Sequence, residues 1–116
     1  MLPKMRQRQR SRAPRRVFPV HRAWVKRHNC TIPGCMGRPI EFAHLRTAAN
    51  SGTGLKPSDA EGISLCLMHH KRAHVKGHDT MAQENGTTFE WLQERAREFA
   101  RRSPDKALQK MLRTVE

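Results

Sequence analysis

Apolar residues in the last third of the chain recur at helical spacing. After Thr88 they fall three or four positions apart, which predicts an amphipathic helix with one face turned to a core. These residues are Phe89, Leu92, Ala96, Phe99 and Ala100. Thr87, with Glu90 three residues later, has the pattern of a capping box, so we expect the helix to begin near Thr87 or Thr88.

Two further helices are predicted from the ends of the chain. Ser103 followed by Pro104 is a cap followed by proline at the first helical position, which predicts a last helix. Its apolar side comprises Leu108, Met111, Leu112 and Val115. A shorter apolar pattern from Val17 to His28 predicts a helix that leads into the core. We expect the C-terminal helices to serve packing and scaffolding.

In the middle of the chain, apolar and polar residues first alternate as in a strand and then follow a helical spacing. Residues 38–45 form a predicted strand that His44 ends on the face of two apolar side chains, with Glu41 on the opposite face. A short strand at 63–65 should pair back, and a helix should run over 68–76 until a glycine ends it. The elements together predict a small α+β fold.

Charge is concentrated at the N-terminus. The chain carries a formal net charge of +13, and residues 1–40 hold eleven Lys or Arg and no acidic residue. Residues 1–16 have too few apolar side chains to form a core, which predicts a disordered basic arm that binds a polyanion. The alternative is a tail that is only solvated. The arginines expected to contact DNA there are Arg6, Arg8, Arg10, Arg12, Arg15 and Arg16.

The composition favours a metal-stabilised protein in a reducing compartment. Only 36% of the 116 residues are hydrophobic, so a large core is out of reach. No apolar run predicts a membrane span or a secretory signal, so we expect an intracellular protein without membrane contact. Three cysteines are a poor basis for disulfides and in such a setting more often indicate metal.

Four residues have the spacing of a structural zinc site. Cys30 and Cys35 flank a Pro-Gly turn that brings both thiols to one side, and Cys66 precedes His69 by three positions. A Cys3His set fills a tetrahedral sphere and supplies folding energy to a small core. The alternative is three buried apolar cysteines and a surface histidine.

Two more histidines follow on the same predicted helix. His70 and His74 are four residues apart, so their imidazoles share one face within reach of a single ion. They would form half of a second, open metal site. Alone such a pair is weak evidence, because exposed helical histidines are common.

Motifs over residues 28–86 resemble one family of nucleases. The cysteine pair, "EFAHL", a Gly-rich loop with "GLKPSD", and "ISLCLMHHKRAH" are similar to the HNH endonucleases of the His-Me finger group, in particular their small, zinc-stapled phage and prophage branch. The resemblance implies a ββα-metal core and hydrolysis of DNA phosphodiester bonds. It also implies a role in phage or prophage DNA recombination or processing, in the cytoplasm of a bacterial or phage-infected cell. Because the sequence shows no recognition helix with an obvious base-reading set, we expect low sequence specificity.

The resemblance also implies roles for individual residues. By position, His44 is the general base, His70 the helix-borne metal ligand, and His74 a second ligand or a phosphate contact. Phosphodiester hydrolysis needs a base near neutral pH and a cation that offsets the charge of the transition state. Mg or Mn is the first expectation for this divalent ion, with Ni or Zn as alternatives.

The chain departs from the family pattern at two positions. Ala43 stands where many members have a metal-binding His or Asp, and Glu61 stands near the usual Asn. Asp59 is our candidate to supply the missing carboxylate or to orient His44, with a turn or N-cap role as the alternative. His78 follows a glycine and is expected to leave the helix face.

Basic residues around this site are expected to contact phosphates. Arg46 and Lys56 lie at or in the long loop of residues 46–60, which is rich in Gly, Ser and Thr. Lys71, Arg72 and Lys76 lie on the metal-binding helix. We therefore divide the chain into a basic arm (1–20), a zinc-stabilised nuclease core (21–86) and a C-terminal helical extension (87–116).

Two other classes of function stay open. A non-catalytic zinc module that binds nucleic acid would explain the arm and the Cys3His set, but it would leave His44, His70 and His74 without a joint purpose. An accessory subunit could dock through the C-terminal helices on a recombination or packaging protein. The pattern of residues decides neither the form of the DNA nor the oligomeric state.

Overall fold

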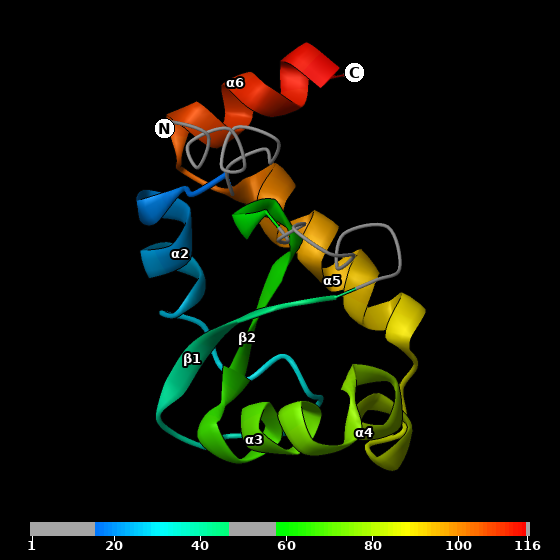
Figure 1. The fold of residues 1–116 in the computed structure, drawn as a ribbon. Coiled ribbons are helices and arrows are strands. Elements are labelled where there is room, and N and C mark those ends of the chain that lie inside the picture. Colours follow the sequence, from blue (N-terminus) through cyan, green and yellow to red (C-terminus); the bar gives the residue numbers. More distant parts are fainter. Residues whose placement is uncertain (1–15, 47–57, 116) are drawn as a thin grey trace, which may run out of the picture.

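A two-stranded antiparallel sheet forms the centre of the fold. Strand β1 (Ile40–His44) pairs with β2 (Gly62–Cys66) so that Ile40 lies opposite Cys66 and His44 opposite Gly62. Every residue of β2 is buried, whereas most of β1 is half-buried. The computed structural model describes residues 16–46 and 58–115 (Figure 1).

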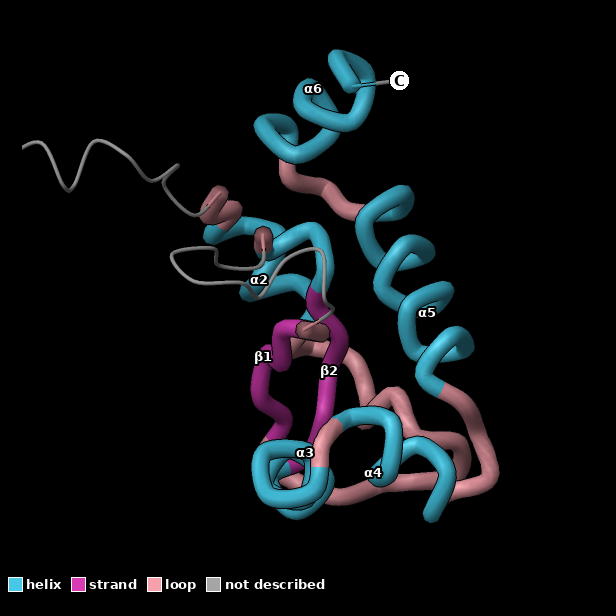
Figure 2. Tube along the Cα trace, turned by 45° about the vertical axis from the view of Figure 1, so that its right-hand side comes forward, coloured by secondary structure: helices cyan, strands magenta, loops and turns pink. Residues whose placement is uncertain are grey.

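Helices surround this sheet in the described part of the chain. They are α2 (Pro19–Val25), the 3-10 helix η1 (Asp59–Glu61), α3 (Leu67–Lys76), α4 (His78–Glu84), α5 (Phe89–Arg102) and α6 (Lys106–Val115). Helix α5 packs along β2 and η1, and α3 leaves β2 without a linker (Figures 1 and 2). The α+β class expected from the sequence is confirmed.

The hydrophobic core joins the sheet to α4 and α5. Ile63 and Leu65 of β2 are fully buried against Met81 of α4 and Leu92 of α5. Further along α5, Ala100 belongs to a second buried cluster. The amphipathic helix expected from the spacing after Thr88 is therefore present, and its apolar face is buried as predicted.

The start of α5 differs from the expectation by one residue. The hydroxyl oxygen of Thr88 accepts a hydrogen bond from the Trp91 N–H at 3.1 Å, so Thr88 is the cap. The hydroxyl of Thr87 instead donates to the carbonyl of Ala82. The expected capping box of Thr87 and Glu90 is wrong, because Thr87 closes the preceding turn.

Two more boundaries differ at the C-terminal side. The sequence does not predict α4, which begins directly after Gly77, a residue with φ +92° that L side chains rarely adopt. Its buried Met81 and Ala82 explain why the short segment becomes helical. Helix α6 begins at Lys106 and not at Pro104.

The buried side chain of His21 ties α2 to the start of α6. Its Nδ1 lies 2.7 Å from the hydroxyl oxygen of Ser103, and its backbone N–H donates to Asp105. Asp105 also accepts from the N–H groups of Ala107 and Leu108, which sets where α6 begins. Burial, opposed by the nearby charge of Asp105, lowers the pKa of His21 from its ordinary value.

A glycine in β2 makes room for the aromatic side chain beside His44. A Cβ atom at Gly62 would overlap the ring of Phe42. Gly62 lies opposite His44 in the sheet, and Phe42 precedes His44 by two positions on β1. The Phe42 ring packs edge-to-face with the His44 imidazole, with ring centroids 5.1 Å apart. Gly62 is therefore required for the close approach that places Phe42 against His44.

We expect Gly62→Ala to lower the free energy of unfolding by about 1–3 kcal/mol, because the added methyl overpacks a closed contact. Urea unfolding measures this cost. In a Phe42→Leu background the cost should shrink, because the ring that is struck is gone. A Gly62→Ala protein with the wild-type midpoint and slope would contradict the packing described.

Candidate metal centre and active site

Three thiols and one imidazole converge at the junction of β2 and α3. The Sγ atoms of Cys35 and Cys66 lie 3.8 Å apart, and the sulfurs of Cys30, Cys35 and Cys66 lie 3.3 to 3.5 Å from Nδ1 of His69. A zinc tetrahedron with bonds of about 2.3 Å to sulfur and about 2.0 Å to nitrogen has edges of about 3.5 to 3.8 Å. The four residues predicted from the sequence can therefore hold a structural metal ion.

Local backbone features aim these ligands at one point. Cys66 is the N-cap of α3, and its sulfur accepts from the N–H of His69 at 3.5 Å. Gly37 passes over the cluster so closely that a Cβ there would lie 3.0 Å from the Cys66 sulfur. Its N–H donates to Cys35 at 3.4 Å. The turn thus delivers two ligands, Cys30 and Cys35, and the end of β2 and the first turn of α3 deliver one each.

An amide on the far side of the imidazole fixes which nitrogen faces the thiols. Nε2 of His69 lies 3.3 Å from Oδ1 of Asn85, while Nδ2 of Asn85 donates to the carbonyl of Met81 at 2.7 Å. Since that donation assigns the amide oxygen to the histidine side, Nε2 carries the proton and Nδ1 keeps its lone pair. Such an outer partner is typical of metal-ligating histidines.

Burial makes the thiolate form of Cys30 costly without a cation. Desolvation raises the pKa of the Cys30 thiol to about 11. A bound metal ion reverses this cost, because coordination deprotonates the thiol. The cluster is the only group of three or more Cys, His, Asp or Glu with such closely spaced ligand atoms within residues 16–46 and 58–115.

The predicted base, His44, is paired with the predicted carboxylate. Nε2 of His44, at the end of β1, lies 2.7 Å from Oδ1 of Asp59, which belongs to η1. A carboxylate only accepts, so Nε2 carries a proton and the neutral ring has its lone pair on Nδ1. Asp59 is not the helix cap, because the side chain of Ser58 fills that role with Glu61 in a capping box.

Helix α2 and the residue before it supply two more donors to the same carboxylate. Asp59 is fully buried, and it accepts from the Phe18 N–H at 2.8 Å and from Arg22 Nη2 at 2.9 Å. Burial opposes its charge, but the bonds from Arg22, Phe18 and His44 outweigh burial and hold the pKa of Asp59 below its ordinary value. With both oxygens engaged, Asp59 suits the orienting role and not that of a metal ligand.

The predicted metal ligand His70 has an acidic partner that sequence reasoning missed. Nδ1 of His70 lies 2.6 Å from Oε1 of Glu41 on β1. Strand alternation puts Glu41 on the face away from His44 and gives no reason to link it to the helix. Because α3 follows β2 without a linker, its first turns pass the beginning of β1, within reach of Glu41.

A cavity of about 410 Å³ lies between β1 and α3. His44, His70 and His74 all line it, so the structure brings the three predicted histidines together. His78 leaves helix α3, as expected, because it begins α4, yet its side chain also lines the cavity. Burial, with the neighbouring charges of His70, His74 and Arg46, lowers the pKa of His78 to about 4.

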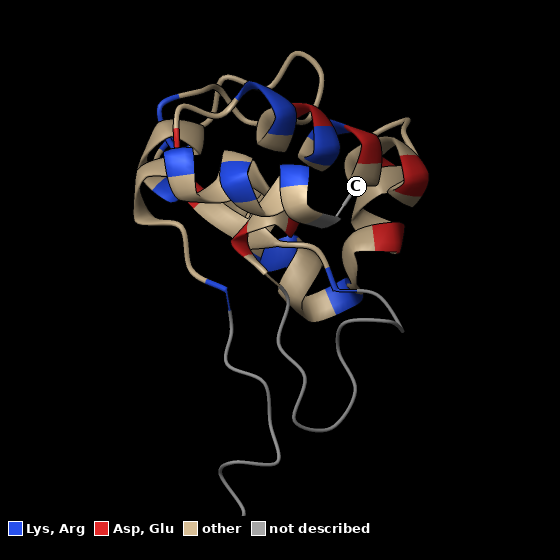
Figure 3. Cartoon of the chain, turned by 90° about the horizontal axis from the view of Figure 1, so that it is seen from above, with Lys and Arg blue, Asp and Glu red and all other residues tan. Residues whose placement is uncertain are grey.

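The predicted phosphate contacts differ in their surroundings. Arg46 lines the histidine cavity, and Lys71 and Lys76 are exposed on α3. Arg72 is instead held by Glu84 through two guanidinium nitrogens, at 2.9 and 2.5 Å, so it is engaged within the protein. Lys and Arg positions occur on several helices (Figure 3).

Part of the expected DNA-binding surface falls outside the described residues. These positions are Lys56 and the arm arginines Arg6, Arg8, Arg10, Arg12 and Arg15. Arg16 is described and exposed, and its carbonyl accepts from the backbone N–H of Asp59 at 3.0 Å. Arg16 is therefore attached to the backbone of the residue whose carboxylate holds His44.

Comparisons with protein-family models, with curated proteins and with solved structures gave no match to this chain. The resemblance to HNH nucleases therefore stays a prediction from the motif residues. None of the helices in the described residues has the length and apolar character needed to cross a bilayer.

We expect the Cys3His cluster of the purified protein to bind one zinc ion and Cys66→Ser to lose it, with aggregation or partial unfolding, because metal binding supplies folding free energy that a small core needs. Metal analysis and thermal melting measure both effects. Lys71→Ala is the matched control, since it alters an exposed position of the same helix and should keep the zinc. A Cys66→Ser protein that melts like wild type, from a preparation that never held zinc, would refute the assignment.

We expect Asp59→Asn to lower the free energy of unfolding by about 2 kcal/mol near neutral pH, because the three groups that donate hydrogen bonds to Asp59 lose a charged acceptor. The pKa of Asp59 is lowered on folding, so its contribution is present above the unfolded-state pKa of about 3.9 and is lost as the pH falls through the lower folded value. Unfolding free energies of the wild type and the Asp59→Asn protein, plotted against pH, should converge in acid. Parallel curves would contradict this.

Proposed function

We propose that this protein is a metal-dependent endonuclease that hydrolyses DNA phosphodiester bonds. The observation that carries the proposal is the pairing of His44 with Asp59 and of His70 with Glu41 around one cavity. Two half-buried imidazoles, each oriented by a carboxylate, face a space that Arg46 also lines. A zinc module that only binds nucleic acid has no use for this arrangement.

In this proposal His44 is the general base. Asp59 fixes the ring with Nε2–H toward itself, so that Nδ1 is the atom that takes a proton from the attacking water. As the imidazole becomes positively charged, the adjacent ionised carboxylate stabilises it. Arg22 keeps Asp59 ionised and lies over the Phe42 ring at 5.3 Å, which holds the whole group in place.

His70 and His74 would hold the divalent cation. Glu41 accepts a hydrogen bond from Nδ1–H of His70, which leaves Nε2 as the ligand atom. The ring centroids of His70 and His74 lie 4.8 Å apart. A cation there supplies positive charge to the phosphate and the leaving oxygen. Because Asp59 is engaged elsewhere, the donors are imidazoles, so the geometry favours Mn, Ni or Zn over Mg.

The excess of basic residues supports a nucleic acid as the substrate. The net charge of +13 favours a polyanion, and Arg46 puts one positive charge on the wall of the cavity. The expected setting in phage or prophage DNA recombination or processing stays a prediction from the resemblance.

We expect His44→Ala to lower the cleavage rate by about 10²–10⁴-fold, as loss of a general base does, with zinc content, melting temperature and DNA affinity close to wild type. His70→Ala should also abolish cleavage, but added Mn should restore part of it, because that change weakens metal binding. Plasmid and single-strand nicking assays with Mg, Mn, Ni and Zn measure both. Val75→Ala, at an exposed position of the same helix with no role in the proposal, is the control.

Undiminished turnover by a purified His44→Ala protein would show that the base is assigned wrongly. If the wild-type protein cleaves no DNA with any of the four ions, the non-catalytic zinc module becomes the better account of the chain.

A further inference from the structure

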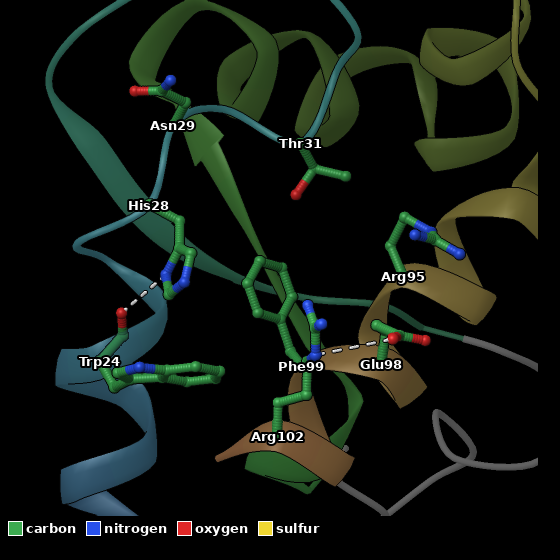
Figure 4. Close-up of a pocket in the computed structure, with 8 residues that line it drawn as sticks. All are labelled: Trp24, His28, Asn29, Thr31, Arg95, Glu98, Phe99 and Arg102. Atoms are coloured by element: carbon green, nitrogen blue, oxygen red, sulfur yellow. Dashed lines mark hydrogen bonds and ion pairs between the residues drawn. The ribbon is translucent and has the colours of Figure 1, made fainter. Parts of the chain in front are cut away.

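A second cavity lies between α2 and α5 and shares no residue with the histidine cavity. It has a volume of about 220 Å³, several times the roughly 30 Å³ share of a water molecule. Figure 4 shows the eight residues that line it. They are Trp24, His28, Asn29, Thr31, Arg95, Glu98, Phe99 and Arg102.

Three aromatic rings form one part of its wall. Trp24 and Phe99 pack edge-to-face at 5.8 Å, and the His28 ring lies 4.7 Å from Trp24 and 5.1 Å from Phe99. Nδ1 of His28 donates to the carbonyl of Trp24 at 3.0 Å (Figure 4). The neutral ring therefore keeps Nε2 as an acceptor, and the rings hold one another in fixed positions.

Two guanidinium groups of α5 form the other part. Arg102 lies 3.8 Å from Glu98, which Arg101 outside the cavity also binds at 2.6 Å. Arg95 lies over the Trp91 ring at 5.4 Å, and its Nε is buried without a hydrogen-bond partner among the described residues. Among the described residues Arg95 has no carboxylate partner, so the charge of its guanidinium is left for a ligand, in a wall whose single carboxylate is already neutralised.

A basic groove adjoins this cavity and shares His28 with it. Lys26 and Arg27, just after α2, and Arg38, just before β1, line the groove. Arg38 is anchored by a 2.7 Å bond from its guanidinium to Asn29, which lines the aromatic cavity. A path of positive charge therefore leads to the rim of an aromatic pocket, the arrangement that suits a phosphate backbone beside a stacked base.

We propose that this cavity binds an unpaired base of single-stranded DNA, with the neighbouring phosphates on Lys26, Arg27 and Arg38. The base stacks on the face of one of the two perpendicular rings, Trp24 or Phe99, and meets the edge of the other. Arg95 donates to the edge of the base or to its own phosphate. This binding goes beyond the proposed nuclease function. It rests on that function in one respect only: the strand held in the cavity is then a substrate for cleavage. Duplex DNA cannot enter, because its bases are stacked and paired.

The test compares three labelled DNA probes by fluorescence anisotropy, with the full chain and no added divalent ion. They are an oligothymidine, an abasic strand of the same length, and a duplex. Stacking on one aromatic site is worth about tenfold or more in affinity, so oligothymidine should bind at least tenfold more tightly than the abasic strand. Equal affinities for these two strands would overturn the proposal, because their phosphates are identical.

Variants locate the effect in the cavity. Trp24→Leu and Arg95→Gln should each reduce the preference for oligothymidine over the abasic strand, with unchanged zinc content. Arg97→Gln is the matched control, since Arg97 lies on the same helix but is paired with Glu94 at the surface. If the Trp24→Leu protein fails to fold, the two arginine variants decide. Equal effects of these two arginine changes would refute the cavity as the site.

These outcomes are separate from those of the cleavage assay. Loss of base preference in the Arg95→Gln protein, together with no cleavage by wild type, would leave the base pocket in place and remove the nuclease. Cleavage that depends on His44, with no base preference in the wild type, would support the nuclease and refute the base pocket.

Discussion

The convergence of Cys30, Cys35, Cys66 and His69 is the constraint on which the rest of the structure depends. It joins a turn, the end of β2 and the first turn of α3. Because β2 runs straight into α3, fixing Cys66 and His69 also fixes the angle at which the helix leaves the sheet. That angle brings His70 to Glu41 and opens the cavity beside His44.

Asp59 is the second centre of the fold. It lies at the end of the long loop, yet it accepts hydrogen bonds from Phe18 and Arg22 as well as from His44, so it joins three separate parts of the chain. A buried carboxylate is stable only with such partners. The same contacts that compensate its burial also hold the histidine in one orientation. The proposed chemistry therefore uses a carboxylate that Phe18 and Arg22 already hold in place.

Short-range patterns predicted most of this fold, and long-range contacts account for what was missed. The Cys3His cluster, the two strands and the apolar face of α5 could be predicted, because each depends mainly on spacing within a few residues. The pair of Glu41 with His70 could not, since it depends on how α3 crosses β1. Arg22 was missed, and the place of His78 in the cavity was not expected, for the same reason: their surroundings come from tertiary neighbours and not from any local motif.

The adjacency of His69 and His70 has a consequence for which changes in chain length the protein can accept. One residue of α-helix corresponds to about 100° of rotation, so consecutive histidines serve two different sites from one turn. An insertion of a single residue after Cys66 would rotate the rest of α3 by that angle and carry His70 and His74 away from the cavity. Substitutions in α3 can be tested one at a time, but its length between Cys66 and His74 is fixed by geometry.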